Sequence, residues 1–452
     1  MNLNHAVVYG SLFLLTGCGS LMKTQYQQPK LDLPTQWQQD VNLSMKQDQP
    51  IDFHDPNLAH VISLVLENNH DLALAGIKLK LARVTAGLTN TNLTPDFTLT
   101  GSASNTKSIK HGDRPQESYS SGLSLNYELD LWGKLARVRE RDEWEAIASE
   151  FDYQATTLTL ISTTSQLYWR IALLSQQIDN QIAGKEIAEK ILAQTESWYL
   201  AGKIGQIDIL HAKQTVITRE NELTRLINQR NNEKNALILL LNNTKLPESV
   251  VIKPINLAQS VPVKYSVPLS VISARPDVRA TESRLRSMLA NSDASKLSFY
   301  PTISLQAALN AGSQLFSQWF NDPTRVVGGA ISLPFIQWNT VQLTIEQSDL
   351  QVQQAGIEFR KSAYNAIMEV NNAIDARATA DNQKSQLLEA FSLSQQRLKL
   401  TENRYQAGAV DYQTVLNAQD DVLSIENLLA QNQYDYLYAT LQLWLAQGGG
   451  YK

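Results

Sequence analysis

The sequence repeats itself at an offset of 206 residues, and the repeat extends from about residue 69 to 447 without a gap. Residues that shape a fold stay aligned in the two copies. The matched pairs are Pro95 and Pro301, Trp132 and Trp338, Tyr199 and Tyr405, Gly202 and Gly408, Leu210 and Leu416, and Ala212 and Ala418. Unrelated helical segments would not keep proline, tryptophan and glycine aligned over such a length. The chain is therefore predicted to contain one structural unit in two copies.

Each copy is predicted to contain a helix, two strands and two long helices. In the first copy, apolar residues recur with helical spacing over 57–92. Alternation of apolar and polar residues then predicts strands at about 97–104 and 119–130. The second copy repeats this alternation at about 302–310 and 327–335.

The predicted strands suit a membrane. Each has about ten residues, the length that a tilted transmembrane strand needs. One face is apolar and the other polar, as a lipid-facing exterior and a wet lumen require. The same alternation also fits an ordinary antiparallel sheet that packs on a globular core.

Four strands are too few to close a barrel, and an open strand edge is not tolerated in lipid. A transmembrane sheet of this chain would therefore be shared with copies of itself. Two copies would give eight strands, three would give twelve and four would give sixteen. Composition does not choose among these numbers.

The long helices predict two antiparallel helical hairpins. Residues 133–200 contain no proline, and a helix of this length extends on the order of 100 Å. A partner helix is predicted at about 207–243. The second copy repeats the hairpin from 340–405, which turns at Gly408 and returns to residue 446. An ordinary coiled-coil scaffold is the alternative, but the strand pair beside each hairpin favours a membrane protein.

The N-terminus has the features of a bacterial lipoprotein. Residues 6–15 form an apolar run of signal-peptide length, although the preceding residues lack lysine and arginine. The run ends in Leu15-Thr16-Gly17-Cys18, which resembles a lipobox and contains the only cysteine of the chain. Cys18 is therefore the predicted site of lipid attachment, and Gly19 after it favours the outer membrane. The alternative is an unmodified signal peptide with an incidental cysteine. After residue 18 no stretch of eighteen apolar residues occurs, so strands would make any membrane crossing.

These features divide the chain into six predicted segments. They are a signal peptide at 1–17, a lipid-anchored segment at 18–56, repeat 1 at 57–243, a linker or equatorial segment at 244–270, repeat 2 at 271–447 and a tail at 448–452.

The sequence gives no reason to expect catalysis, a cofactor or nucleic acid. The net charge is −5, which is no basis for binding nucleic acid. The histidines do not have the spacing of metal ligands. They stand at positions 5, 54, 60, 70, 111 and 211. Asp420 and Asp421 lie on a polar helix, where we interpret them as solvated or facing a lumen rather than as an acid–base pair.

Several motifs resemble one family, the TolC-like outer-membrane factors, in their lipoprotein (NodT-type) branch. The resemblance covers nearly the whole chain, and the motifs are specific only together. They are Ala274-Arg275-Pro276-Asp277-Val278-Arg279, Phe299-Tyr300-Pro301-Thr302, Glu128-Leu129-Asp130-Leu131-Trp132-Gly133, Tyr405-Gln406-Ala407-Gly408 and Ala446-Gln447-Gly448-Gly449-Gly450-Tyr451.

The resemblance implies an α+β membrane protein that is a homotrimer, with a shared twelve-stranded β-barrel and a periplasmic barrel of twelve helices. It implies that the hairpin tips, at Ala201, Gly202, Ala407 and Gly408, meet a periplasmic adaptor (membrane fusion) protein that joins the channel to an inner-membrane pump. Gating would be an iris-like untwisting of the inner hairpin. The predicted function is a passive exit duct for drugs or other small solutes. The alternatives are the outer-membrane component of a type I protein-secretion system and a non-conducting periplasmic coiled-coil scaffold lipoprotein.

The resemblance also locates a gate, and here the sequence departs from the family. The positions that correspond to a narrowing ring of carboxylates are Thr414 and Asn417, and neither can ionise. Asp208 and Asp411 remain as acids near the tips, and copies of either carboxylate around an aperture would repel one another and attract cations. The alternative is that both acids simply favour helix starts. Tyr405 is predicted to make closing contacts or to pack the hairpin.

Overall fold

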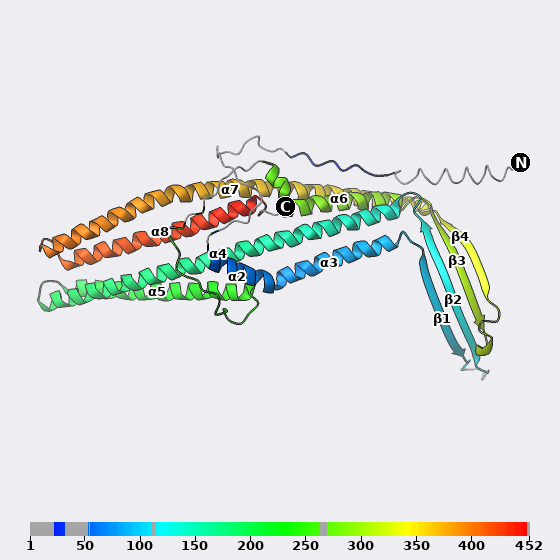
Figure 1. Ribbon diagram of the computed structural model, residues 1–452, viewed down its shortest axis with the longest axis horizontal. Coiled ribbons are helices and arrows are strands. Elements are labelled where there is room, and N and C mark those ends of the chain that lie inside the picture. The colour runs from blue at the N-terminus through cyan, green and yellow to red at the C-terminus, as the bar shows by residue number, and fades with distance from the viewer. Residues whose placement is uncertain are drawn as a thin grey trace. The chain divides into compact units, whose positions relative to one another are not determined.

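The computed structural model describes residues 22–31, 53, 55–109, 114–259, 261 and 269–449 (Figure 1). The predicted signal peptide, Cys18 and most of the segment 18–56 lie outside the described residues. The chain forms two compact units. Of the described residues, unit 1 contains 22–31, 76–109, 114–152 and 279–362, and unit 2 contains 53, 55–75, 153–259, 261, 269–278 and 363–449.

Long helices and four strands make up the part of the chain that the structure describes, as the sequence predicts. In chain order the elements are α2 (Pro56–Asn68), α3 (His70–Thr91), β1 (Asp96–Thr106), β2 (Gln116–Leu129), α4 (Lys134–Leu200), α5 (Gln206–Leu240), η1 (Leu269–Ala274), α6 (Pro276–Leu297), β3 (Thr302–Ser313), η2 (Phe316–Gln318), β4 (Thr324–Ser332), η3 (Pro334–Ile336), α7 (Trp338–Gln406) and α8 (Tyr412–Ala446).

The internal duplication is confirmed in the elements. Helix α8 begins and ends 206 residues after α5, since 412 − 206 is 206 and 446 − 206 is 240. Strand β3 likewise begins 206 residues after β1, at 302 and 96. The same local sequence signals thus produce the same elements twice.

Two predicted boundaries are wrong. The helix expected over 57–92 is interrupted at Asn69, whose backbone is extended and ends α2. The Asn69 side chain accepts hydrogen bonds from the backbone N–H groups of Asp71 (2.9 Å) and Leu72 (3.1 Å), so it caps a new helix, α3. The last strand was expected to reach residue 335, but β4 ends at Ser332. Pro334 has no N–H to donate to a strand partner, and it begins the short turn η3 instead.

In unit 1 the four strands form one antiparallel sheet in the order β1-β2-β3-β4. The register aligns Leu99 with Leu123, and Leu123 with Leu309. In the described part of the chain, neither β1 nor β4 has a strand on its outer side. The sheet therefore has two open edges.

One face of this sheet is apolar and exposed. The register places seven large apolar side chains on that face, and each is 43–80% exposed. They are Phe97, Leu99, Leu123, Leu305, Leu309, Val327 and Ile331. Serine, threonine, asparagine and glutamine dominate the opposite face, for example Thr98, Ser124 and Gln306. The predicted alternation is thus present, and the described residues of unit 1 leave the apolar face uncovered.

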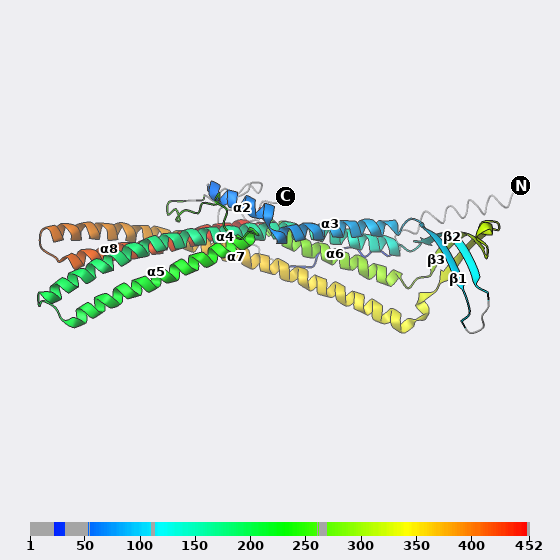
Figure 2. The same ribbon diagram turned by 90° about the horizontal axis from the view of Figure 1, so that it is seen from below.

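The helices of unit 1 follow the order of the strands that they join (Figure 2). Helix α3 contacts α4, α4 contacts α6, and α6 contacts α7. The linking contacts are Thr89 Oγ1 to Asp142 (2.5 Å), Ser287 Oγ to the Arg141 carbonyl (3.0 Å), the Arg284–Asp152 ion pair and Lys296 Nζ to Asp349 (2.8 Å). Helices α3 and α7 are therefore the outer helices, as β1 and β4 are the outer strands.

Unit 2 contains the two hairpins, formed by α4 with α5 and by α7 with α8. Trp169, Leu437 and Leu441 lie in its buried core, together with residues of α2. The irregular segment after α5 packs on this core, since the Ile255 N–H donates to the Ala172 carbonyl at 3.2 Å. No helix in the described ranges has an apolar stretch long enough to cross a membrane.

Candidate functional site

The hairpin tips are the first sequence-predicted site. Tip 1 comprises residues 201–205, between α4 and α5, and tip 2 comprises residues 407–411, between α7 and α8. Most of their side chains are exposed. Both tips are well-defined turns, and the two have the same hydrogen-bond pattern.

Tip 1 closes α4 with a left-handed residue. Gly202 has φ +68°, and its N–H donates to the Tyr199 carbonyl at 2.9 Å. The N–H of Lys203 donates to the Trp198 carbonyl, also at 2.9 Å. This pair of bonds is the Schellman motif, which satisfies the last helical carbonyls. Ala201 precedes the glycine and continues the helical bonding, with its N–H 3.1 Å from the Ser197 carbonyl.

Tip 2 repeats this geometry. Gly408 has φ +71°, and its N–H donates to the Tyr405 carbonyl at 2.9 Å. The N–H of Ala409 donates to the Arg404 carbonyl at 2.9 Å, and Ala407 takes the place of Ala201. A Cβ added at Gly202 or Gly408 would have no neighbour within 4 Å. Glycine is therefore required at both tips by the backbone angle and not by lack of space.

Asp411 and Asp208 both cap helices. Asp411 is the N-cap of α8 and accepts hydrogen bonds from the hydroxyl (2.5 Å) and the backbone N–H (2.9 Å) of Thr414. The hydroxyl bond, followed by the amide bond, lowers the pKa of Asp411 below its usual value. Asp208 lies in the first turn of α5 and accepts from the Gly205 N–H at 3.0 Å. Helix capping accounts for both acids, and a gating role remains a prediction.

The other predicted gate residues lie at two places. Tyr405 is 43% exposed, and its ring packs on Tyr412 with the centroids 5.4 Å apart. Asn417 and Asp208 line the same groove, a cavity of ≈ 260 Å³ that is also lined by His211 of α5 and Trp198 of α4. The structure therefore brings Asp208 and Asn417 to one groove, while Asp411, Thr414 and Tyr405 surround tip 2.

Asp420 and Asp421, interpreted from the sequence as solvated or facing a lumen, are partly exposed, and each also forms an ion pair. Both oxygens of the Asp420 carboxylate lie 2.6 Å from Nη2 of Arg219 on α5. Asp421 forms an ion pair with Arg397 on α7. The two neighbouring acids thus point to different hairpins, and Asp420 links α8 to the first hairpin. Sequence reasoning missed this link because Arg219 and Asp420 are not matched by the internal repeat.

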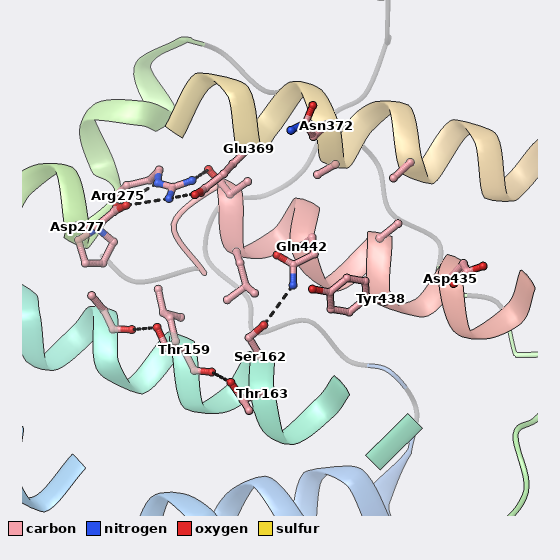
Figure 3. A pocket seen from close by; sticks show the side chains of 18 residues that line it. Thr159, Ser162, Thr163, Arg275, Asp277, Glu369, Asn372, Asp435, Tyr438 and Gln442 are labelled. Carbon is pink, nitrogen blue, oxygen red and sulfur yellow. Dashed lines mark hydrogen bonds and ion pairs between the residues drawn. The ribbon is translucent and has the colours of Figure 1, made fainter. Parts of the chain in front are cut away.

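A second polar site surrounds Arg275 (Figure 3). The side chain of Arg275 is only 9% exposed. Its Nε donates to Asp277 (3.1 Å), and its Nη2 donates to Asp277 (2.9 Å) and to Glu369 (2.6 Å). Its Nη1 lies 3.4 Å from the Ala446 carbonyl. Burial opposes the charged form, but the two carboxylates outweigh it and raise the pKa of Arg275. Arg275 therefore joins α6, α7 and the end of α8.

A cavity of ≈ 710 Å³ lies beside this site. Gln442 of α8 donates to Ser162 of α4 across it at 3.2 Å, and Tyr438 and Asp435 also line it (Figure 3). The remaining lining side chains include many alanines. Sequence reasoning noted Arg275 only as part of a family motif, and its contacts depend on pairings across helices that the sequence does not reveal. Within the described residues no group of three histidine, cysteine, aspartate or glutamate side chains is placed to hold a metal ion.

Comparison with known proteins gives one consistent result. The model of the outer membrane efflux protein family matches residues 61–243 and 267–449. The toxin and drug export protein A of Aggregatibacter actinomycetemcomitans is 28% identical over 402 residues, 88% of each chain. The cation efflux system protein CusC of Escherichia coli O6:H1 is 26% identical over 452 residues, 97% of each chain. The probable outer membrane lipoprotein SilC of Salmonella typhimurium is 26% identical over 461 residues, which is 98% of this chain and 97% of SilC.

Solved structures agree with this result. A crystal structure of CusC, described in terms of transmembrane channel formation, superposes with a TM-score of 0.80 at 25% identity, covering 94% of this chain and 99% of the other. The open state of the Neisseria gonorrhoeae MtrE outer membrane channel superposes with a TM-score of 0.81 at 25% identity, covering 95% and 98%.

Proposed function

The chain belongs to the outer membrane efflux protein family, and from that premise we propose that it is the outer-membrane channel lipoprotein of a tripartite efflux system. It would be a passive exit duct for drugs or other small solutes across the periplasm and the outer membrane. Members of the family are channel proteins, so this role needs no catalytic site.

One observation carries the proposal. In the described residues, the sheet of unit 1 exposes a largely apolar face, and neither β1 nor β4 has a strand on its outer side. Exposed apolar patches of this kind mark contact with another apolar phase. Lipid fits the apolar face, and copies of the same chain fit the two open edges, because a strand edge in hydrocarbon must be paired.

The proposed assembly is a homotrimer. Three copies of a four-stranded sheet give a barrel of twelve strands, an even number as in bacterial single-chain barrels. Repeats 57–243 and 271–447 would each contribute two strands and one hairpin, with 244–270 between them. The choice of three rests on resemblance to the family, because the sheet itself fits any number of copies that closes.

The N-terminus would anchor the channel. Cleavage after residue 17 would leave Cys18 as the first residue, acylated and inserted in the outer membrane. The name of the relative SilC, a probable outer membrane lipoprotein, supports this placement. In this proposal the hairpin tips contact a periplasmic adaptor protein that connects the channel to an inner-membrane pump. Asp208, Asp411 and Tyr405 remain the proposed gate residues.

The names of the relatives favour efflux over the alternatives. They include cation, solvent and toluene efflux systems, while one name combines toxin and drug export. A type I protein-secretion component is therefore the less favoured function. A non-conducting scaffold would not explain an exposed apolar sheet face.

Fractionation together with an export assay tests the proposal. Outer membranes from cells that carry the chain should contain an SDS-resistant oligomer that separates on heating, and those cells should retain less of an exported dye than cells without it. A Cys18→Ala variant should lose the lipid and most of the outer-membrane signal. A monomeric chain in the soluble periplasmic fraction, with unchanged dye retention, would contradict the proposal.

A further inference from the structure

The cavity beside Arg275 has the size and the lining of a small-molecule site. It lies between α4, α7 and α8, and its volume of ≈ 710 Å³ falls within the range of such sites, about 300–1,000 Å³. Much of the lining is apolar, and small side chains leave the space open (Figure 3). The lining residues all lie in unit 2, so a single chain supplies them. The apolar ones include Ala155, Leu158, Ala373, Ala376, Ala439 and Ala446.

The cavity lies on one face of α8, and the irregular segment after α5 packs on the other. Asp435, Tyr438 and Gln442 recur every three to four residues along the cavity face. Gln433, nine residues before Gln442, is about 180° away around the helix. Its side-chain amide donates to the Gln259 carbonyl at 2.8 Å. The described residues of the segment after α5 are absent from the lining, so they do not fill the cavity.

The cavity carries an excess of negative charge. Its lining contains three acidic side chains, Asp277, Glu369 and Asp435, and one basic side chain, Arg275. Asp277 and Glu369 together hold Arg275, so its charge is already compensated and is not open to an anion. The electrostatic field of the remaining acid therefore favours a cation. Within the described residues no acids are grouped to hold a metal ion, and a metal ion would leave the apolar lining unused.

Asp435 and Tyr438 offer a cation a favourable position. Burial raises the pKa of Asp435, which outweighs the hydrogen bond from Gln431 (3.0 Å) and the charge of Arg170. A cation beside this carboxylate would therefore stabilise its charged form. One helical turn away, the ring of Tyr438 lines the same cavity (Figure 3). It stacks on Tyr434 with the centroids 6.1 Å apart, and aromatic rings attract organic cations.

We propose that this cavity binds a monovalent organic cation with an apolar body. The cationic group lies beside Asp435 and the ring of Tyr438, and the apolar body lies against the alanines of α7 and α8. Such a site goes beyond the proposed duct, which needs no ligand site of its own.

Binding of tetraphenylphosphonium, an apolar organic cation, tests the proposal. The purified chain in detergent is dialysed against the probe, and a selective electrode measures the free concentration, with protein-free detergent as the blank. We expect saturable binding. Tetraphenylborate, which has the same shape and a negative charge, should show none. Because a single chain supplies the lining, the measurement applies to a monomer and to an oligomer alike.

Two variants should weaken binding by different routes. Asp435→Asn removes one charge at nearly constant size and should raise the dissociation constant at least about tenfold. Ala376→Trp fills the cavity from α7 and should abolish binding, and the exposed position of Ala376 lets the fold accept the larger side chain. Glu186→Gln is the control, because it removes an exposed acid of α4 that does not line the cavity. Each variant should keep the helical circular dichroism spectrum of the unsubstituted chain.

The outcomes separate this site from the channel. Equal binding of tetraphenylphosphonium by Asp435→Asn and Glu186→Gln would overturn the site, as would the absence of saturable binding in a chain that still exports dye. Either result would leave the channel standing. Saturable binding that both cavity variants lose, in a chain that exports no dye, would support the site and count against the channel.

Discussion

Replacing Gly408 separates the fold of tip 2 from its proposed contact with an adaptor. The backbone there has φ +71°, which costs any residue with a Cβ about 1–2 kcal/mol. A Cβ would meet no atom within 4 Å, so no steric cost adds to this figure. Alanine and tryptophan should therefore destabilise the tip by the same small amount, well below the total stability of a folded domain, about 5–15 kcal/mol.

The two variants differ in what an approaching protein meets. Gly408→Trp places a bulky side chain on an exposed turn, whereas Gly408→Ala adds one methyl group. If the tip is the docking surface, the tryptophan variant should lose at least about tenfold in dye export, a loss of about 1.4 kcal/mol in binding. The alanine variant should keep most of it. Both should give the SDS-resistant oligomer in outer membranes at normal amounts.

The outcomes of this pair distinguish three accounts. Equal loss of export in both variants would point to backbone strain instead of docking. Normal export with tryptophan would refute the role of the tip in contacting a partner. Loss of the oligomer in either variant would show that a Cβ at position 408 destabilises the chain by more than this estimate of the backbone cost.

Four further predictions concern the polar contacts of unit 2. Asp411→Asn keeps a side chain that can cap α8 but removes the charge, so it should reduce any effect of divalent cations on conductance. If the effect of divalent cations is unchanged, Asp411 only caps the helix and has no role in the gate. Asp411→Ala removes the cap as well and should destabilise α8 by about 1 kcal/mol, seen as faster hydrogen exchange in its first turn. Because the pKa of Asp411 is lowered in the folded chain, its capping contribution is complete above the usual aspartate pKa of about 4 and is lost as the pH falls through the lowered pKa. The exchange rate in that turn, divided by the intrinsic rate at each pH, should therefore rise on acidification in the unsubstituted chain and not in Asp411→Asn. A lysine at position 275 cannot reproduce the hydrogen bonds of Arg275 to Asp277 and Glu369, so Arg275→Lys should lower the stability of the fold by about 1–3 kcal/mol. The loss should be near the lower end because the two carboxylate side chains are 45% and 58% exposed. An unchanged separation temperature of the oligomer would refute the structural role of Arg275.

Local sequence signals predict most of the fold. The alternation around Leu99 and Leu123 gives the strands, and the proline-free stretch up to Leu200 gives α4, because both patterns are periodic over many residues. The two wrong boundaries lie at positions where a single side chain determines where a helix or strand ends. Asn69 interrupts a helix that its apolar neighbours would continue, and Pro334 ends a strand before its alternation stops.

The polar sites were only partly predictable, for a different reason. Gly202 and Gly408 were predicted at the hairpin tips, and a glycine just after a long helix usually forms a left-handed turn. The ion pair of Asp420 with Arg219, and the contacts of Arg275, depend on which helices become neighbours. No local pattern encodes that pairing, and the internal repeat does not help because these residues have no charged counterpart in the other copy.

The central claim is that copies of this chain together form a water-filled pore, and single-channel recording tests it most directly. Purified oligomer that keeps its SDS resistance should be inserted in a planar lipid bilayer at a potential of either sign. We predict discrete, uniform conductance steps that appear with each insertion and disappear when the oligomer is separated by heating. Oligomer that inserts in the bilayer but passes no current, including in variants of Asp411 and Tyr405 that remove the proposed gate contacts, would contradict the account.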